Sequence, residues 1–232
     1  MGNVAQMRRI LAVVSSTSTL PSGRSTGYTL EELAAPYARF REAGFDVDVA
    51  SPSGGAVAHD PAYDSGPFLT EDGRKFLADE AAKAKLSATA PLRALDASNY
   101  DGFFLVGGVA AAKDFDANPD LERLLERALS EGKVIGAVCH GVVGLSGVRT
   151  PGGDLAAKGE AMTGFSHDEE VAAGLLAEVA VVPETRLRDL GADYLKAAEP
   201  WGVCVVEGGH FVTGQNPASA SATAEAMLKR LL

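Results

Sequence analysis

The sequence is poor in cysteine, in positive charge and in long hydrophobic runs. Only two of its 232 residues are cysteine, which is too few for a disulfide framework and indicates a reducing compartment. Asp and Glu outnumber Lys and Arg by 31 to 21, so neither a nucleic acid nor an anionic membrane is expected as a partner. No apolar run could span a membrane, and the early run at 10–14 is too short for a signal-peptide core. We therefore expect a cytoplasmic protein.

The residues that are present have the composition of a globular chain, with 46% hydrophobic and 22% charged residues. Short apolar runs alternate with helical patterns. Strands are expected at 10–14, 46–50, 102–106, 133–138 and 202–206, and helices at 29–43, 118–132 and 219–232. This alternation predicts an α/β fold with a doubly wound, mostly parallel sheet and helices on both faces, a flavodoxin-like three-layer sandwich. Functional side chains are then expected at the carboxyl ends of the strands.

One domain is expected over residues 1–232. Two stretches are longer than the connections that a minimal fold of alternating strands and helices needs. The segment 51–95 holds clusters of Pro, Gly and Asp and then one helix-like segment at about 71–85. The segment 175–201 includes a short helix after Pro183. We interpret both as small cap insertions that wall a pocket.

The turn after the strand at 133–138 has the spacing of a nucleophile elbow. Cys139 has a small residue two positions before it, Ala137, and another two positions after it, Gly141. An abrupt strand-to-helix turn forces strained backbone angles on the nucleophile, and bulky neighbours at these positions would collide. A helix amino terminus behind the sulfur would favour the thiolate, so a pKa well below that of free cysteine is expected.

The alternative is that Cys139 is a buried filler, which is the commoner role of a free cysteine. The preceding strand and the surrounding glycines favour the nucleophile. Cys204, by contrast, lies in the interior of the predicted strand 202–206 and is expected only to pack. His140 could serve as a base, but adjacent residues on a tight turn point apart, so it need not touch Cys139 directly.

The elbow Ala-Val-Cys-His-Gly resembles that of the ThiJ/PfpI superfamily, which shares the class I glutamine-amidotransferase-like fold. The resemblance extends along nearly the whole chain, to the branch that holds heat-shock-type chaperones and glutathione-independent glyoxalase III. The matching stretches lie at 26–36, 44–48, 50–55, 163–165 and 212–219. Each is modest alone, but together and in this order they are specific.

The resemblance implies roles for individual residues. Cys139 corresponds to the nucleophile, and Glu32 to the acidic residue that hydrogen-bonds the cysteine sulfur. Glu32 has a competing structural interpretation, because Thr29-x-x-Glu32 is also the pattern of a helix capping box. The neighbouring Glu31 is expected to face elsewhere.

A carboxylate should hold His140 in the right tautomer, and three lie together at 168–170. Ser166-x-x-Glu169 reads as a second capping box, so Glu170 is preferred over Glu169 and Asp168, and it also matches the family's third member by position. His167 and Glu170 have a spacing that metal ligands can use, but no further ligands cluster around them, so no metal is expected.

The chain departs from the family pattern at two positions. The loop after the strand 102–106 is commonly Gly-Gly-His-Gly in this branch, and here Val109 replaces its histidine. Gly108 and Val109 remain candidates for oxyanion and substrate binding through their backbone amides. A second histidine, often found just before a proline, is Ala35 here.

The resemblance implies a cofactor-independent cysteine enzyme of glyoxalase III or deglycase type. It would convert a small 2-oxoaldehyde such as methylglyoxal to a 2-hydroxy acid, without metal, nucleotide or glutathione, and would act as a homodimer. Two alternatives are a thiol hydrolase on another substrate and a stress-response holdase chaperone or redox sensor. A glutamine amidotransferase is disfavoured, because residues 216–219 replace its usual histidine–glutamate pair.

Overall fold

The computed structural model describes residues 8–232, so the first seven residues of the predicted domain lie outside it. Seven strands form one sheet in the order β3-β2-β1-β4-β5-β9-β8. Their bounds are β1 Arg9–Val13, β2 Asp46–Ser51, β3 Ala90–Pro91, β4 Gly102–Leu105, β5 Val134–Val138, β8 Val205–Gly208 and β9 Phe211–Gly214. Strand β8 runs antiparallel to β9, and the other neighbours are parallel.

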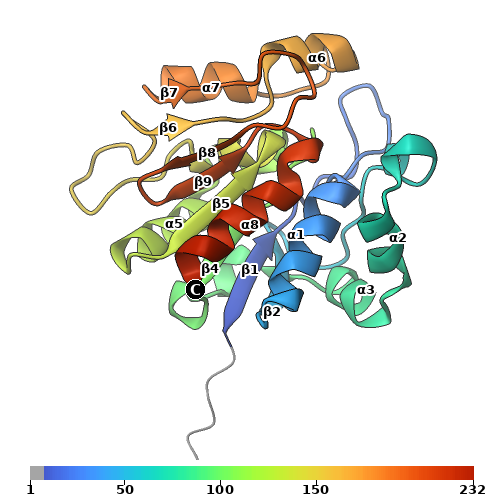
Figure 1. Cartoon of the computed structure of the whole chain (residues 1–232), viewed down its shortest axis with the longest axis horizontal. Helices are drawn as coiled ribbons and strands as arrows, with labels where there is room; N and C mark the ends of the chain where they lie inside the picture. The colour runs from blue at the N-terminus through green and yellow to red at the C-terminus, as the bar shows by residue number, and fades with distance from the viewer. Residues whose placement is uncertain (1–7) are drawn as a thin grey trace, which may run out of the picture.

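Helices cover both faces of this sheet (Figure 1). Helices α1 (Leu30–Glu42) and α8 (Ala220–Leu231) lie on one face, and α5 (Pro119–Ser130) lies on the other. In β1, Ile10 and Ala12 pack into the core beneath α1 and α8, whereas Leu11 and Val13 pack into the core beneath α5. Strands buried on both faces need apolar residues at every position. The predicted doubly wound, mostly parallel sheet is confirmed.

The segment 51–95 adds an edge strand and two helices. It contains the 3₁₀ turns η1 (Pro61–Tyr63), η2 (Gly66–Phe68) and η3 (Leu92–Ala94), the helices α2 (Glu71–Ala78) and α3 (Glu80–Ser87), and β3. The prediction of one helical segment at 71–85 is wrong. Asp79 has an extended backbone that ends α2, and its carboxylate accepts the amides of Ala81 and Ala82 at 2.9 and 3.1 Å to begin α3.

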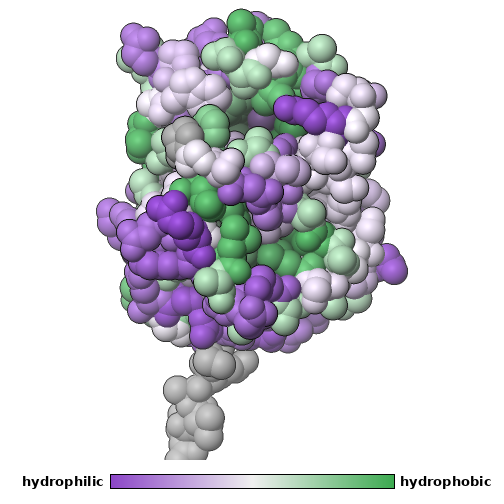
Figure 2. Space-filling model, turned by 90° about the vertical axis from the view of Figure 1, so that its right-hand side faces the viewer, coloured by the Kyte–Doolittle hydropathy of each residue, from purple (hydrophilic) through white to green (hydrophobic). Residues whose placement is uncertain are grey.

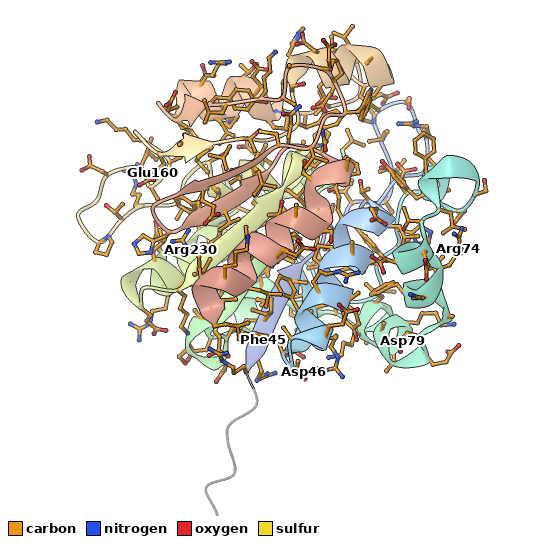
Figure 3. All side chains as sticks on the ribbon, viewed as in Figure 1. Phe45, Asp46, Arg74, Asp79, Glu160 and Arg230 are labelled. Atoms are coloured by element: carbon orange, nitrogen blue, oxygen red, sulfur yellow. The ribbon has the colours of Figure 1, made fainter. Side chains whose placement is uncertain are left out.

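A group of short elements between residues 161 and 194, called the cap below, covers one side of the sheet, at the top of Figure 1. It consists of α6 (His167–Ala173), α7 (Pro183–Asp189) and the parallel pair β6 (Ala161–Met162) and β7 (Asp193–Tyr194). The short helix predicted after Pro183 is therefore present. Phe45 and Asp46, at the amino end of β2, lie on the opposite side of the molecule, at the bottom of Figure 3. The carboxyl ends of the parallel strands thus lie on the side of α6 and α7.

The remaining short elements are α4 (Ala111–Asp114) and the 3₁₀ turns η4 (Ala97–Asn99), η5 (Cys139–Leu145) and η6 (Pro217–Ser219). The predicted strand 202–206 begins only at Val205, so Cys204 precedes the strand instead of lying within it. Its side chain is half-buried, unlike that of a strand-interior residue. The prediction of an interior packing position for Cys204 is wrong.

Candidate active site

Cys139 lies on a strained turn directly after β5. Its φ of 59° is in the left-handed region, which non-glycine residues rarely adopt. A Cβ at Gly141 would come within 2.4 Å of the Leu105 carbonyl oxygen, so the turn requires glycine there. The chain continues as the 3₁₀ turn η5, not as the expected α-helix. The elbow geometry predicted from the small flanking residues is present.

His140 connects Cys139 to Glu170. Its Nδ1 lies 3.2 Å from the Cys139 sulfur, and its Nε2 lies 2.7 Å from Glu170 Oε1. Because the carboxylate accepts the Nε2 proton, the Nδ1 lone pair faces the thiol. The sequence left open whether His140 touches Cys139, and the strained turn brings both side chains into direct contact.

The three acidic residues at 168–170 have separate contacts. Asp168 forms an exposed salt bridge with Lys196, and Glu169 forms a capping box with Ser166. Glu170 is fully buried, and it is the member that reaches the imidazole of His140. The capping box predicted at Ser166 is confirmed, and the carboxylate preferred in the sequence is the one that contacts His140.

Glu32 lies on the first turn of α1, but the predicted capping box with Thr29 is wrong. The Thr29 side chain makes no capping hydrogen bond. Glu32 is instead buried, and neither carboxyl oxygen has a hydrogen-bond partner within residues 8–232. It faces the loop after β4, because a Cβ at Gly107 would lie 2.3 Å from Glu32 Oε2 and 2.8 Å from Cys139 Cβ. The carboxyl group and the thiol therefore meet across Gly107. Glu31 faces elsewhere as expected, and accepts the Thr70 hydroxyl.

Burial controls the ionisation of this pair. It raises the pKa of Glu32 to about 8, although the Cys139 thiol and the Gly107 amide approach closely enough to lower it somewhat. Burial also raises the pKa of Cys139, and an ionised Glu32 would raise it further; the amides of His140 and Gly108 act in the opposite direction. The prediction of a lowered thiol pKa is thus wrong for the free protein, because the sulfur is buried and no α-helix begins behind it. At neutral pH, Glu32 keeps its proton and can donate it toward the sulfur.

Gly108 and Val109 lie in the loop after β4, beside Glu32 and Cys139. A Cβ at Gly108 would meet the Gly27 carbonyl oxygen at 2.7 Å and the Thr29 nitrogen at 2.8 Å, and its φ of +107° also favours glycine. Neither amide donates a backbone hydrogen bond within the described chain, so both are available to a bound oxyanion. The oxyanion role itself stays a prediction. The Val109 side chain is buried, as is Ala35 on α1.

Aromatic residues that the sequence analysis did not identify as site residues surround His140 and Cys139. The Phe165 ring lies 4.7 Å from the His140 ring, and its amide donates to the Cys139 carbonyl oxygen at 3.3 Å. The Trp201 ring lies 5.5 Å from Phe165. Tyr63, on η1, packs against the core cluster that contains Cys139 and Phe165. Tyr63 and Trp201 reach this region from the two insertions, where no local sequence pattern marks them.

Residues 8–232 bring together no group of three or more His, Cys, Asp or Glu side chains suited to hold a metal ion. The expectation that no metal or other cofactor is needed stays a prediction. No helix in this part of the chain is long and apolar enough to cross a membrane.

Comparison with known proteins places the chain among glyoxalases and structurally similar proteins. A glutathione-independent glyoxalase of Schizosaccharomyces pombe is 30% identical over 241 residues, covering 97% of both chains. The structure of glyoxalase III from Candida albicans superposes with a TM-score of 0.88 at 26% identity, covering 96% of this chain and 97% of that one. The structure of the rapid encystment protein of 24 kDa from Francisella tularensis superposes with a TM-score of 0.92 at 31% identity, covering 97% of this chain and all of that one.

The family resemblance of the elbow and its flanking motifs is therefore confirmed. Residues 25–230 match the DJ-1/PfpI family. The chain belongs to the DJ-1/PfpI family.

Proposed function

We propose that the protein is a glutathione-independent glyoxalase of the glyoxalase III type. It would convert a small 2-oxoaldehyde such as methylglyoxal, with one water molecule, into the corresponding 2-hydroxy acid. The single observation that carries the proposal is the buried chain of contacts from the Cys139 sulfur to His140 Nδ1 and from His140 Nε2 to Glu170. The curated relatives named as glutathione-independent glyoxalases support it over nearly the full chain.

The first step is activation and addition of the thiol. His140 Nδ1 accepts the Cys139 proton over 3.2 Å, and Glu170 stabilises the imidazolium that forms. The sulfur bonds to the aldehyde carbon, and the carbonyl π electrons move to its oxygen. This oxyanion takes a proton and becomes the hydroxyl of a hemithioacetal. The free amides of Gly108 and Val109 and the protonated Glu32 are the donors available to this oxygen.

The second step moves a proton between the two carbons. Deprotonated His140 removes the hydrogen from the former aldehyde carbon, giving an enediol, and returns a proton to the adjacent carbon. The product is a thioester of Cys139 with the 2-hydroxy acid. Water then attacks the thioester carbonyl, the carbon–sulfur bond breaks, and the thiol and acid are released. The steps sum to the addition of one water with no external oxidant, reductant or cofactor.

The direct test is NMR of methylglyoxal incubated without glutathione. Wild-type protein should form lactate, and Cys139→Ser should lower the rate by roughly 10⁴-fold or more, because removing a nucleophile abolishes the covalent route. Cys204→Ser is the matched control and should retain wild-type turnover. If wild-type protein forms no lactate, the proposed activity is wrong.

A thiol hydrolase is the second candidate, since a buried Cys–His–Glu chain also suits acyl transfer. The buried Val109 and Ala35 would then favour a less polar substrate. An ester or amide probe that leaves a stable acyl group on Cys139 would favour this candidate. In either case we place the protein in the cytoplasm, acting as a homodimer on a small molecule.

A holdase activity would use a different part of the surface. The cap and the segment that follows it expose five large hydrophobic side chains: Val171, Leu176, Leu195, Trp201 and Val203. Figure 2 shows hydrophobic surface at the top of its view, on the side of α6, and exposed patches of this kind bind other proteins. If Cys139→Ala abolished turnover but still protected an aggregating client, the two activities would reside at different sites.

A further inference from the structure

The loop at 58–63 is fixed against the chain that leads into α1. A Cβ at Gly27 would lie 1.9 Å from the Ala58 carbonyl oxygen, so the two backbones touch. The Tyr28 amide donates to that oxygen at 3.3 Å, and the Asp60 amide donates to the Tyr28 carbonyl at 2.9 Å. The same segment therefore holds both this loop and the helix that carries Glu32.

Asp60 fixes the direction of the loop. Its carboxylate accepts the Thr26 hydroxyl and the Ala62 amide, each at 2.9 Å, and its carbonyl accepts the Tyr63 amide at 3.0 Å. These bonds form the 3₁₀ turn η1, which ends at Tyr63. These hydrogen bonds fix the backbone at Tyr63 relative to Thr26 and Tyr28.

The Tyr63 side chain packs against the core that contains the buried thiol. Its ring packs edge-on against Phe68, with centroids 5.8 Å apart, and against the core cluster that includes Cys139. The side chain is half-buried, whereas Cys139 is buried. Burial raises the pKa of the Tyr63 hydroxyl, and charge on the nearby Glu32 or Cys139 would raise it further. The phenol therefore stays protonated at any working pH.

We propose that Tyr63 is a further catalytic residue, whose hydroxyl donates a hydrogen bond to the 2-oxo oxygen of a 2-oxoaldehyde bound to Cys139. The inference rests on the proposed function and adds a residue to it. A dicarbonyl attached to the sulfur has two oxygens to stabilise. The amides of Gly108 and Val109 can serve the oxygen on the attacked carbon, and His140 is committed to the thiol and Glu170. The 2-oxo oxygen becomes the second enediol oxygen and needs a donor of its own, which the neutral Tyr63 phenol supplies.

The test is Tyr63→Phe, which removes one oxygen and keeps the ring that packs on Phe68. Loss of one donor to a developing oxyanion should lower kcat roughly 10²-fold with a smaller change in KM, and leave Tm unchanged. Tyr100→Phe is the matched control. Tyr100 precedes β4, at the opposite end of the parallel strands from Cys139, and its variant should turn over as the wild type does. Wild-type kcat in Tyr63→Phe would overturn the inference while leaving the proposed function intact.

A second measurement separates the two proposals. ¹³C-labelled methylglyoxal added to each protein reports the hemithioacetal on Cys139, which should form several-fold more weakly in Tyr63→Phe than in wild type. A wild-type adduct without lactate would refute the glyoxalase and still test Tyr63 through this difference. Equal adduct affinity in the two proteins, or no adduct in wild type, would overturn the role of Tyr63.

Discussion

Two glutamates, Glu169 and Glu32, are both fully buried, yet their surroundings are opposite. Glu169 accepts four hydrogen bonds, from the Ser166 amide and hydroxyl, the Trp201 amide and the Asn216 side chain. Among residues 8–232, Glu32 has no partner at hydrogen-bond geometry, and it lies beside a thiol. A buried carboxylate with all its partners stabilises a fold, whereas one left without partners costs stability and marks a functional position.

The hydrogen bonds of Glu169 hold the segment around Trp201 close to the site. Trp201 has a φ of 67°, a strained value for a non-glycine residue, and its amide points to Glu169 at 2.9 Å. Asn216 donates to both Glu169 and the Gly202 carbonyl, each at 2.8 Å. Glu169 therefore fixes the segment that places the Trp201 ring on Phe165, next to His140.

The largest expected effect is that of Glu169→Ala on stability. It leaves the amide of Trp201 and the amide group of Asn216 without their acceptor in a buried site, and should lower the free energy of unfolding by about 4 kcal/mol. Chemical denaturation at pH 7 measures it. Asp168→Ala is the control, because its exposed salt bridge with Lys196 should contribute less than about 0.5 kcal/mol. Equal effects of the two variants would remove the distinction drawn for Glu169.

Glu32→Gln should raise the free energy of unfolding at neutral pH, whereas Glu169→Ala lowers it. The folded pKa of about 8 exceeds the ordinary 4.5, so folding favours the protonated form. Wild-type stability is then fully present below pH 4.5 and is lost as pH rises toward 8. Between pH 4 and 7, Glu32→Gln should gain roughly 3 kcal/mol relative to wild type, while turnover falls about 10²-fold because the amide cannot exchange a proton.

Denaturation curves at the two pH values, with methylglyoxal turnover, test this pair of effects. Glu42→Gln, at the exposed end of the same helix, is the control and should change the free energy of unfolding by less than about 0.5 kcal/mol, since its pair with Arg39 is at the surface. A constant stability difference between wild type and Glu32→Gln across this range would contradict the proposed protonation of Glu32.

Asn216→Ala should make Glu169 more like Glu32 by removing one of its partners. The variant also frees the Gly202 carbonyl, so we expect a loss of about 2 kcal/mol in the free energy of unfolding. Asn99→Ala, at an exposed position, is the control and should be nearly neutral. A neutral Asn216→Ala would mean that the remaining donors satisfy Glu169 without it.

The sequence predicted the parts of the site that depend on local pattern. The small residues around Cys139 indicate the strained turn, and the Ser166–Glu169 capping box leaves Glu170 to face His140. The same cap pattern at Thr29 left two interpretations of Glu32, because the spacing does not reveal whether Glu32 turns toward its own helix end or toward Cys139.

Other parts could not be predicted because they depend on long-range contacts. Tyr63 reaches the site only because its loop rests on Gly27, and Trp201 only because Glu169 and Asn216 hold its segment. The pKa of Cys139 depends on burial by the finished fold, which the elbow motif does not encode. The order of the main strands and helices, by contrast, follows from apolar runs that are buried on both faces.

A ¹³C NMR titration of the Glu32 side-chain carboxyl group, assigned with Glu32→Gln, measures directly whether Glu32 is protonated beside Cys139. A buried carboxyl group without partners beside Cys139 should titrate with a midpoint near 8 and be protonated at pH 7. A midpoint near the ordinary value of 4.5 would rule out this role of Glu32, because Glu32 would then be a carboxylate at neutral pH and could not donate a proton toward the sulfur.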